Sequence, residues 1–313
     1  MSYLPQVNRI MNVNDIKGFH IELTNMCTLK CPGCARTQFI EQWPQHWRNH
    51  NLTAEDLFNF LDVDLNGLLI TLCGNYGDPI YHPEFLNIVG EFKKRGSKLD
   101  IVTNGSYKTE SWWYELTHLL NEHDSVTFAV DGTSENFIQY RINGDWESIK
   151  TGMKIIANSN CNSTWKYIVF AFNQNDIEKT KNLSDNIGIQ NFKVDYSDRY
   201  DEKTLYLKPT SSDLVGQRFQ AQQNFKNNIQ NKVNANCLAN KSEHFITADG
   251  YYTPCCYTAD HRFYYKNEFG KNKKEYAIKD STMTEILNRP KVLQFYNELK
   301  LQPVCQFNCP GSN

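Results

Sequence analysis

The feature that most constrains the fold of this chain is a regular alternation of strand-like and helix-like segments. Short runs of apolar or β-branched residues recur between residues 19 and 197, and each is followed by a longer segment with helical spacing. Strands joined by such crossovers must pair in parallel, and right-handed crossovers curl the sheet towards a barrel or part-barrel. The predicted strands are Phe19–Thr24, Gly67–Cys73, Lys98–Thr103, Ser125–Val130, Trp165–Phe172 and Asn191–Tyr196.

The alternation ends near Leu207, which predicts two domains. We expect an α/β domain over residues 1–207 and a smaller domain over residues 208–313, because a chain of 313 residues can bury one large core and still carry an appendage. A polar segment rich in Gln and Asn, from 216 to 236, is predicted to be a helix that links the two.

The second domain is predicted to be a small α+β unit. Asp249-Gly250 lies between two short apolar runs, and this pair favours a tight hairpin turn because glycine readily adopts positive φ angles. A helix is predicted at Ser281–Leu299, before a tail that carries cysteines.

Composition and charge exclude several classes of protein. Residues 1–17 are polar and lack the apolar core of a signal peptide, and no later run has the length of apolar residues that a membrane span requires. A formal net charge of −2 provides no overall positive field for nucleic acid. We therefore expect a cytoplasmic protein that binds neither nucleic acid nor a membrane.

Ten cysteines are many for a cytosolic chain, where thiols stay reduced, so grouped cysteines indicate metal or redox sites before disulfides. The first group, Cys27, Cys31 and Cys34, follows the first predicted strand with the spacing C-x3-C-x2-C. Three thiolates at this spacing can hold three irons of a [4Fe–4S] cluster and leave the fourth iron open to a ligand. The alternative is a zinc site, with His20 or His46 as the fourth ligand.

This cysteine motif resembles the signature of the radical S-adenosylmethionine (SAM) superfamily. The resemblance covers about residues 18–200 and implies a partial (β/α)6 barrel. It implies that SAM chelates the open iron through its amino and carboxylate groups, and that an electron from the cluster cleaves SAM to a 5′-deoxyadenosyl radical. That radical would abstract hydrogen from the substrate. An external electron donor such as flavodoxin or ferredoxin is implied as well.

Other strand ends resemble the SAM-binding elements of this superfamily. Tyr76-Gly77-Asp78-Pro79 resembles a G-G-E-P segment that holds the amino group of SAM, with Tyr76 in place of the first glycine. Asp131-Gly132 and the following Arg141 resemble a DG…R pattern, in which Arg141 would pair with the SAM carboxylate. The residues that the resemblance implies as SAM contacts are Tyr76, Gly77, Asp78, Asn104, Asp131, Arg141 and Asn173.

The remaining grouped cysteines lie after residue 236. Cys237 and Cys255, with a glycine between them, resemble the opening of the SPASM extension of radical SAM enzymes. Apart from the adjacent Cys256, only two further cysteines follow, which resembles the shortened twitch form with one auxiliary [4Fe–4S] cluster. The implied ligands are Cys237, Cys255, Cys305 and Cys309, with Cys256 spare or substituting. A four-cysteine zinc site is the alternative.

The resemblance implies a radical SAM enzyme that abstracts hydrogen from a small-molecule substrate, by oxidation or epimerisation, with the auxiliary cluster as electron acceptor. Because the first predicted strand begins near the start of the sequence, we expect no separate leader-peptide-binding domain before it, which favours a small molecule. Two alternatives stay open. One is a maturase that modifies a ribosomally made peptide or protein, and the other is a non-catalytic zinc or iron–sulfur binding protein. Cys73 and Cys161 are expected to be core residues.

Overall fold

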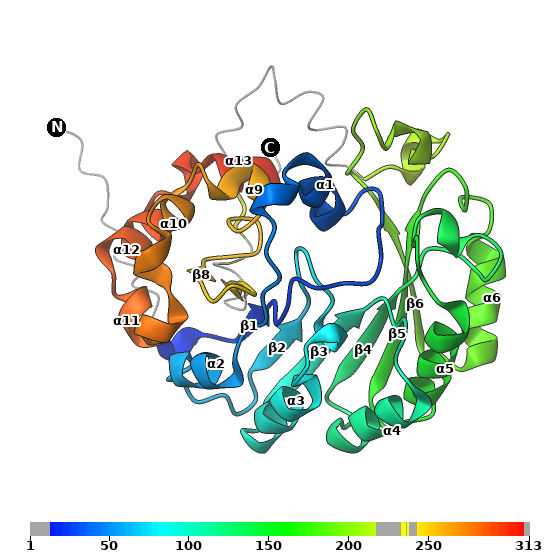
Figure 1. The fold of residues 1–313 in the computed structure, drawn as a ribbon, viewed down its shortest axis with the longest axis horizontal. Coiled ribbons are helices and arrows are strands. Elements are labelled where there is room, and N and C mark those ends of the chain that lie inside the picture. Colours follow the sequence, from blue (N-terminus) through cyan, green and yellow to red (C-terminus); the bar gives the residue numbers. More distant parts are fainter. Residues whose placement is uncertain (1–12, 217–232, 236, 238–242, 310–313) are drawn as a thin grey trace.

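The computed structural model describes residues 13–216, 233–235, 237 and 243–309 (Figure 1). Its centre is an eight-stranded sheet with the order β6-β5-β4-β3-β2-β1-β7-β8. Strands β1 to β6 pair in parallel with their neighbours, which confirms the predicted part-barrel. The bounds are β1 Gly18–Ile21, β2 Leu69–Leu72, β3 Lys98–Thr103, β4 Ser125–Ala129, β5 Asn162–Val169 and β6 Asn191–Tyr196.

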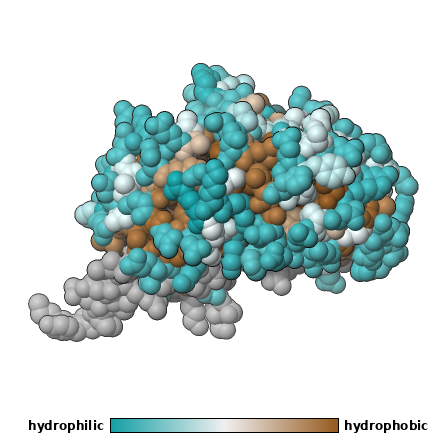
Figure 2. All heavy atoms as spheres, turned by 90° about the horizontal axis from the view of Figure 1, so that it is seen from below, coloured by the Kyte–Doolittle hydropathy of each residue, from teal (hydrophilic) through white to brown (hydrophobic). Residues whose placement is uncertain are grey.

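Helix α1 (Ala35–Gln42) lies at the open side of the curved sheet, whereas the other helices that connect the parallel strands lie along its outside (Figure 1). Their apolar residues face the sheet; in α3, for example, Phe85, Ile88, Val89 and Phe92 are buried. On the face of the molecule shown in Figure 2, hydrophilic residues cover most of the surface, and apolar residues lie between them. The helices are α1 Ala35–Gln42, α2 Ala54–Phe60, α3 Phe85–Lys94, α4 Glu110–Leu119, α5 Trp146–Ala157 and α6 Ile177–Ile187.

The predicted hairpin is confirmed, and it joins the barrel sheet. Strand β7 (His244–Ile246) pairs in parallel with β1, and β8 (Tyr252–Thr253) pairs with β7 in antiparallel orientation. Gly250 has a φ of 82°, the conformation that its place in the turn requires. The second predicted domain therefore shares a continuous sheet with the first.

Short helices follow β8 and cover the β7–β8 end of the molecule (Figure 1). They are α9 His261–Tyr264, α10 Glu268–Lys271, α11 Met283–Leu287, α12 Pro290–Asn297 and α13 Pro303–Asn308. The 3-10 helices are η1 Val13–Asp15, η2 Pro44–His46, η3 Pro79–Tyr81, η4 Phe137–Gln139, η5 Leu205–Leu207, η6 Ser212–Leu214, η7 Lys273–Tyr276, η8 Ile278–Asp280 and η9 Leu299–Leu301. None of the described helices is long and apolar enough to cross a membrane.

The prediction of one helix over Ser281–Leu299 was wrong. The structure has two helices there, and the second begins at Pro290. Proline lacks an N–H group and clashes with the preceding turn, so it starts a helix readily but does not continue one. Arg289, before it, is extended, as a residue preceding proline tends to be. The predicted linking helix over 216–236 lies mostly outside the described residues.

Candidate functional site

A cavity of about 210 Å³ lies at the carboxyl ends of the parallel strands. Cys27, Cys31 and Cys34 line it, together with the loop after β2 and the ends of β3, β4 and β5. Parallel strands end at the same edge of a sheet, which is why segments far apart in sequence meet there. Of the implied SAM contacts, the structure places Tyr76, Gly77, Asp78, Asn104 and Arg141 in the cavity wall.

The cysteines of this cavity receive N–H groups from their surroundings. The backbone N–H of Leu29 and the Asn104 amide point at the Cys27 sulfur, at 3.4 and 3.6 Å. Nη1 of Arg141 lies 3.9 Å from the Cys31 sulfur. Burial raises the pKa of Cys31 to about 12 and also raises that of Cys27, so as free thiols both are protonated at neutral pH. Donors aimed at a buried sulfur suit a metal-bound thiolate.

The loop between β2 and η3 is held against the end of β1. Oε1 of Glu22 accepts hydrogen bonds from the backbone N–H groups of Tyr76 and Gly77, at 2.7 and 3.1 Å. A Cβ atom on Gly77 would lie 1.8 Å from the carbonyl oxygen of Thr24, so only glycine fits this close approach. Burial raises the pKa of Glu22 to about 7.

Asp78 ends this loop as a buried carboxylate. It accepts hydrogen bonds from Oγ1 of Thr103 at 2.8 Å and from the backbone N–H of Asn104 at 2.6 Å, both at the end of β3. The side-chain amide of Asn104 donates to it as well. Burial raises the pKa of Asp78, and these hydrogen bonds oppose that rise. The network fixes one buried acid beside Cys27.

Arg141 and Asp131 form a buried ion pair at the end of β4. Nε of Arg141 lies 2.7 Å from Oδ2 of Asp131, whose Oδ1 accepts the N–H of Ile168 at 2.8 Å. Burial alone would lower the pKa of Arg141, but Asp131 and Cys31 raise it above its usual value, so the guanidinium is charged. Asp131 itself does not line the cavity. Its place is behind Arg141, which it orients.

Asn173 also lies outside the cavity wall, in contrast to its implied role as a SAM contact. It is fully buried, and its amide oxygen accepts the N–H of Phe170 at 2.7 Å. Its amide nitrogen donates to the carbonyl groups of Asp131 and Ile168, at 3.2 and 3.0 Å. The side chain thus ties the ends of β4 and β5 together, and we assign it a structural position.

A second cavity, of about 110 Å³, lies beside the helices that follow β8 and gathers all five late cysteines: Cys237, Cys255, Cys256, Cys305 and Cys309. Burial raises the pKa of the Cys305 thiol, and the nearby thiolates of Cys255, Cys237 and Cys309 would raise it further. Burial also raises the pKa of Cys256, and the charged groups that influence this pKa are Cys255, Glu243, Cys73 and Arg199. Of these, Cys73 and Arg199 line the first cavity. Cys256 therefore lies between the two cavities. Among the described residues, no three His, Cys, Asp or Glu side chains converge as a single metal ion would require.

With this geometry described, comparison with known proteins identifies the family. The model of the radical SAM superfamily matches residues 21–183, which is more than half of the 313 residues. The chain belongs to the radical SAM superfamily. The model of the SPASM iron–sulfur cluster-binding domain matches residues 237–310. These two matches confirm the resemblance that the cysteine motifs indicated.

One curated relative is the tungsten-containing aldehyde ferredoxin oxidoreductase cofactor-modifying protein of Pyrococcus furiosus. It is 33% identical over 129 residues, which cover 39% of this chain and 33% of the relative. This chain therefore matches only about a third of the length of that relative.

Among solved structures, the fold resembles Streptococcus suis SuiB bound to S-adenosylmethionine, with a TM-score of 0.61, 13% identity and coverage of 95% of this chain and 73% of SuiB. SuiB bound to the precursor peptide SuiA gives a TM-score of 0.60 at 14% identity and covers 95% of this chain and 72% of that one. The structure of anSMEcpe with bound AdoMet and Cp18Cys peptide gives 0.57 at 15% identity, with 90% and 82% covered. At these identities the likeness is one of fold.

A radical SAM core and a SPASM domain imply SAM and [4Fe–4S] clusters as cofactors. The residues of the two cavities fit these groups. The first offers three thiols, a buried acid and a charged guanidinium, and the second offers five thiols, the soft ligands that iron–sulfur clusters require.

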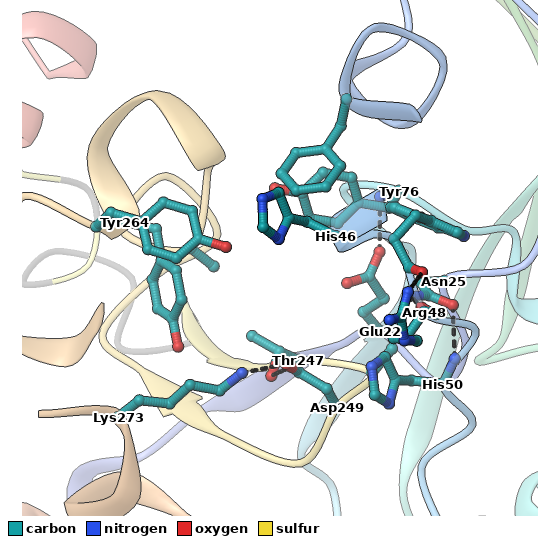
Figure 3. A pocket seen from close by; sticks show the side chains of 15 residues that line it. Glu22, Asn25, His46, Arg48, His50, Tyr76, Thr247, Asp249, Tyr264 and Lys273 are labelled. Atoms are coloured by element: carbon teal, nitrogen blue, oxygen red, sulfur yellow. Dashed lines mark hydrogen bonds and ion pairs between the residues drawn. The ribbon is translucent and has the colours of Figure 1, made fainter. Parts of the chain in front are cut away.

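A third cavity, of about 120 Å³, adjoins the first cavity on the other side of Tyr76, which lines both. Figure 3 shows His46 and Tyr264 on opposite sides of it and Lys273 reaching to Asp249. Burial alone would raise the pKa of Asp249, but the ion pair with Lys273 lowers it. The buried Glu22 contributes to its wall. The cavity is polar and carries charges of both signs.

Several residues of these sites escaped sequence reasoning. Glu22 was counted only as part of the first strand, although an acid at the end of a central parallel strand is itself a signal. Asn75 and Arg199 line the first cavity from loops whose paths the sequence does not reveal. Cys73, expected in the core, lines this cavity too, whereas Cys161 is buried as expected.

Proposed function

We propose that this chain is a radical SAM enzyme that modifies a peptide or protein, with one auxiliary [4Fe–4S] cluster bound by its SPASM region. The observation that carries the proposal is the joint placement of Cys27, Cys31, Cys34, Asp78 and Arg141 around one cavity at the strand ends. When bound, the first cluster and SAM supply reductive cleavage of SAM and hydrogen abstraction from the substrate. The residues of the chain bind, orient and shield these groups.

Each side chain in the first cavity has a distinct role in this proposal. Asp78 would accept hydrogen bonds from the ammonium group of SAM, because Thr103 and Asn104 hold its carboxylate in place beside Cys27. Arg141 pairs with the SAM carboxylate, since a guanidinium presents several donors in a fixed plane. Gly77 allows the loop backbone to approach closely.

For the second cavity we propose Cys237, Cys255, Cys305 and Cys309 as the ligands of the auxiliary cluster. Cys305 lies within electrostatic reach of the other three. Cys256 lines the same cavity, but Cys255 is the only one of these four cysteines that influences its pKa, so we propose that Cys256 is a neighbour of the cluster and not a ligand. A cluster with four protein thiolates has no open iron, which leaves electron transfer as its role. An external donor such as flavodoxin or ferredoxin supplies the electrons, and residue 207 marks the boundary between core and SPASM region.

The fold neighbours support a peptide or protein as the substrate. SuiB and anSMEcpe, which share the fold over most of this chain, were each solved with a bound peptide. The comparisons therefore favour the maturase alternative over the small-molecule substrate expected from the sequence.

The proposal is tested by anaerobic reconstitution of the full chain followed by assay of SAM cleavage. We expect two [4Fe–4S] clusters and dithionite-dependent formation of 5′-deoxyadenosine and methionine. The triple variant Cys27→Ala, Cys31→Ala, Cys34→Ala should keep one cluster and lose SAM cleavage. The matched control Cys161→Ala, a buried cysteine outside both cavities, should keep both. Stoichiometric zinc without iron would overturn the proposal.

A further inference from the structure

The loop between β2 and η3 contacts both cysteine-lined cavities. Asn75 lines the first cavity, and its Nδ2 donates a hydrogen bond of 2.8 Å to the carbonyl oxygen of Cys256, 181 residues away in sequence. Cys256 lines the second cavity beside Cys255. One side-chain hydrogen bond thus joins the wall of the SAM cavity to the wall of the auxiliary cavity.

On the barrel side, Asn75 belongs to a loop that is held at several points. The N–H groups of Tyr76 and Gly77 donate to the buried carboxyl group of Glu22, just after β1. Three residues after Asn75, Asp78 is held by the end of β3. A loop restrained in this way has little freedom to absorb a displacement at Asp78 without moving Asn75.

On the other side, Cys256 belongs to a turn that includes the proposed ligand Cys255. Oγ1 of Thr258 donates to the carbonyl oxygen of Cys255 at 2.6 Å, and the N–H of Cys255 points back to Thr258 at 3.3 Å. The amide of Asn267 donates to the carbonyl oxygen of Thr258 at 2.8 Å. Asn75 adds to this turn a hydrogen bond that comes from the SAM-binding loop.

We infer that Asn75 is a positioning residue that couples SAM binding to the auxiliary cluster through its hydrogen bond to Cys256. The inference rests on the proposed function, because it takes Asp78 as a SAM contact and Cys255 as a cluster ligand. The reduction potential of an iron–sulfur cluster depends on hydrogen bonding around its ligands. Occupation of the first cavity therefore changes the potential of the auxiliary cluster, and reduction of that cluster changes the affinity for SAM by the same factor.

The coupling that one such hydrogen bond can carry is about fivefold in SAM affinity between the oxidised and reduced auxiliary cluster. For a one-electron couple, a fivefold change corresponds to a potential shift of about 40 mV, because a tenfold change corresponds to about 59 mV. A shift of this size is measurable by potentiometry.

The test uses the reconstituted full chain, with the auxiliary cluster followed by electron paramagnetic resonance during a potentiometric titration. In the unaltered protein, saturating SAM should shift the auxiliary midpoint by about 40 mV. In Asn75→Ala, with the SAM concentration raised until the variant is saturated, this shift should vanish. Asn75→Asp, which keeps the size of the side chain but removes the donor, guards against a folding artefact and should behave alike.

Asn267→Ala is the matched control, because it removes a hydrogen bond of equal length to the same turn from a residue outside the SAM cavity. It should retain the SAM-dependent shift, even if its resting potential differs. Two results would overturn the inference: no effect of SAM on the auxiliary cluster in the unaltered protein, or a full shift in both Asn75 variants. If SAM is cleaved normally in either case, only the inference fails; absence of SAM cleavage overturns the proposed function itself.

Discussion

The two cysteine-lined cavities are built in different ways. The walls of the first cavity, called the SAM cavity because we propose that SAM binds there, come from the ends of parallel strands, and its charged groups are fixed by hydrogen bonds such as those from Thr103 and Asn104 to Asp78. The auxiliary cavity is formed by cysteines from separate segments, and the helices after β8 have four to eight residues, against 10 to 12 for α3 to α6. Helices that short are marginal without tertiary contacts. The comparison suggests that protein contacts organise the first cavity and that bonds to iron complete the second.

The largest effect is expected from removal of the iron–sulfur clusters, which tests this difference between the two cavities directly. Removing both clusters should destabilise the segment 243–309 by several kcal/mol, because the free energy of metal binding becomes free energy of folding when a site is incomplete without metal. Strands β3 to β5 should keep their protection. Hydrogen exchange with mass spectrometry on holo and apo protein measures both regions at once. Equal protection of the SPASM region in the two forms would refute the contrast.

The next effect concerns Glu22, whose pKa burial raises to about 7. Since the folded state binds this proton more tightly than the unfolded state, the free energy of unfolding should fall as pH rises from about 4.5 to 7, by up to about 3 kcal/mol. Glu22→Gln should remove this dependence. Urea unfolding at a series of pH values measures it, with Glu91→Gln, on the outer face of α3, as the control. If Glu22→Gln keeps the slope of the unaltered protein, another group and not Glu22 causes the pH dependence.

Arg141→Ala should weaken SAM binding by about thirtyfold, or about 2 kcal/mol, because it deletes a charge-assisted pair to the carboxylate. Arg262→Ala is the matched control, since Arg262 is likewise paired with an aspartate, Asp260, but lies outside the SAM cavity. Isothermal titration of SAM into anaerobic protein gives both affinities. Similar losses in the two variants would deny Arg141 a specific role.

The smallest effect is expected for Asp131→Asn, which tests whether Asp131 contacts SAM itself or only orients Arg141. Asp131→Asn keeps the shape of the side chain but removes the charge that orients Arg141 at 2.7 Å. SAM affinity should fall by about fivefold, which is the scale of one hydrogen bond and less than the effect of removing Arg141. In a double-mutant cycle, Asp131→Asn should cause little further loss of SAM affinity in a protein that already carries Arg141→Ala. Additive losses would mean that Asp131 contacts SAM independently.

The architecture of the barrel was accessible from the sequence to a large extent. The predicted strands Lys98–Thr103 and Asn191–Tyr196 match β3 and β6 at both ends. The spacing of apolar residues in strands and helices is a local property, so it can be recognised without knowledge of the fold. The helix over Ser281–Leu299 failed because its apolar spacing continues through Pro290, whose effect on the backbone outweighs the pattern.

What the sequence by itself determined about this protein is its chemistry: the C-x3-C-x2-C spacing after a strand is a local property, and it indicates three thiolates and the radical SAM superfamily. Which polar residues face the cavity was decided only by the tertiary structure. Asp78, Asp131 and Asn173 all follow strands, but only Asp78 lines the first cavity. Asp131 and Asn173 lie behind the cavity wall, where buried groups need hydrogen-bond partners. Asp131 accepts the N–H of Ile168 and pairs with Arg141, and Asn173 accepts the N–H of Phe170. The contact of Asn75 with Cys256 likewise depends on β7 pairing with β1, a long-range event that brings residues 181 apart in sequence into hydrogen-bond distance.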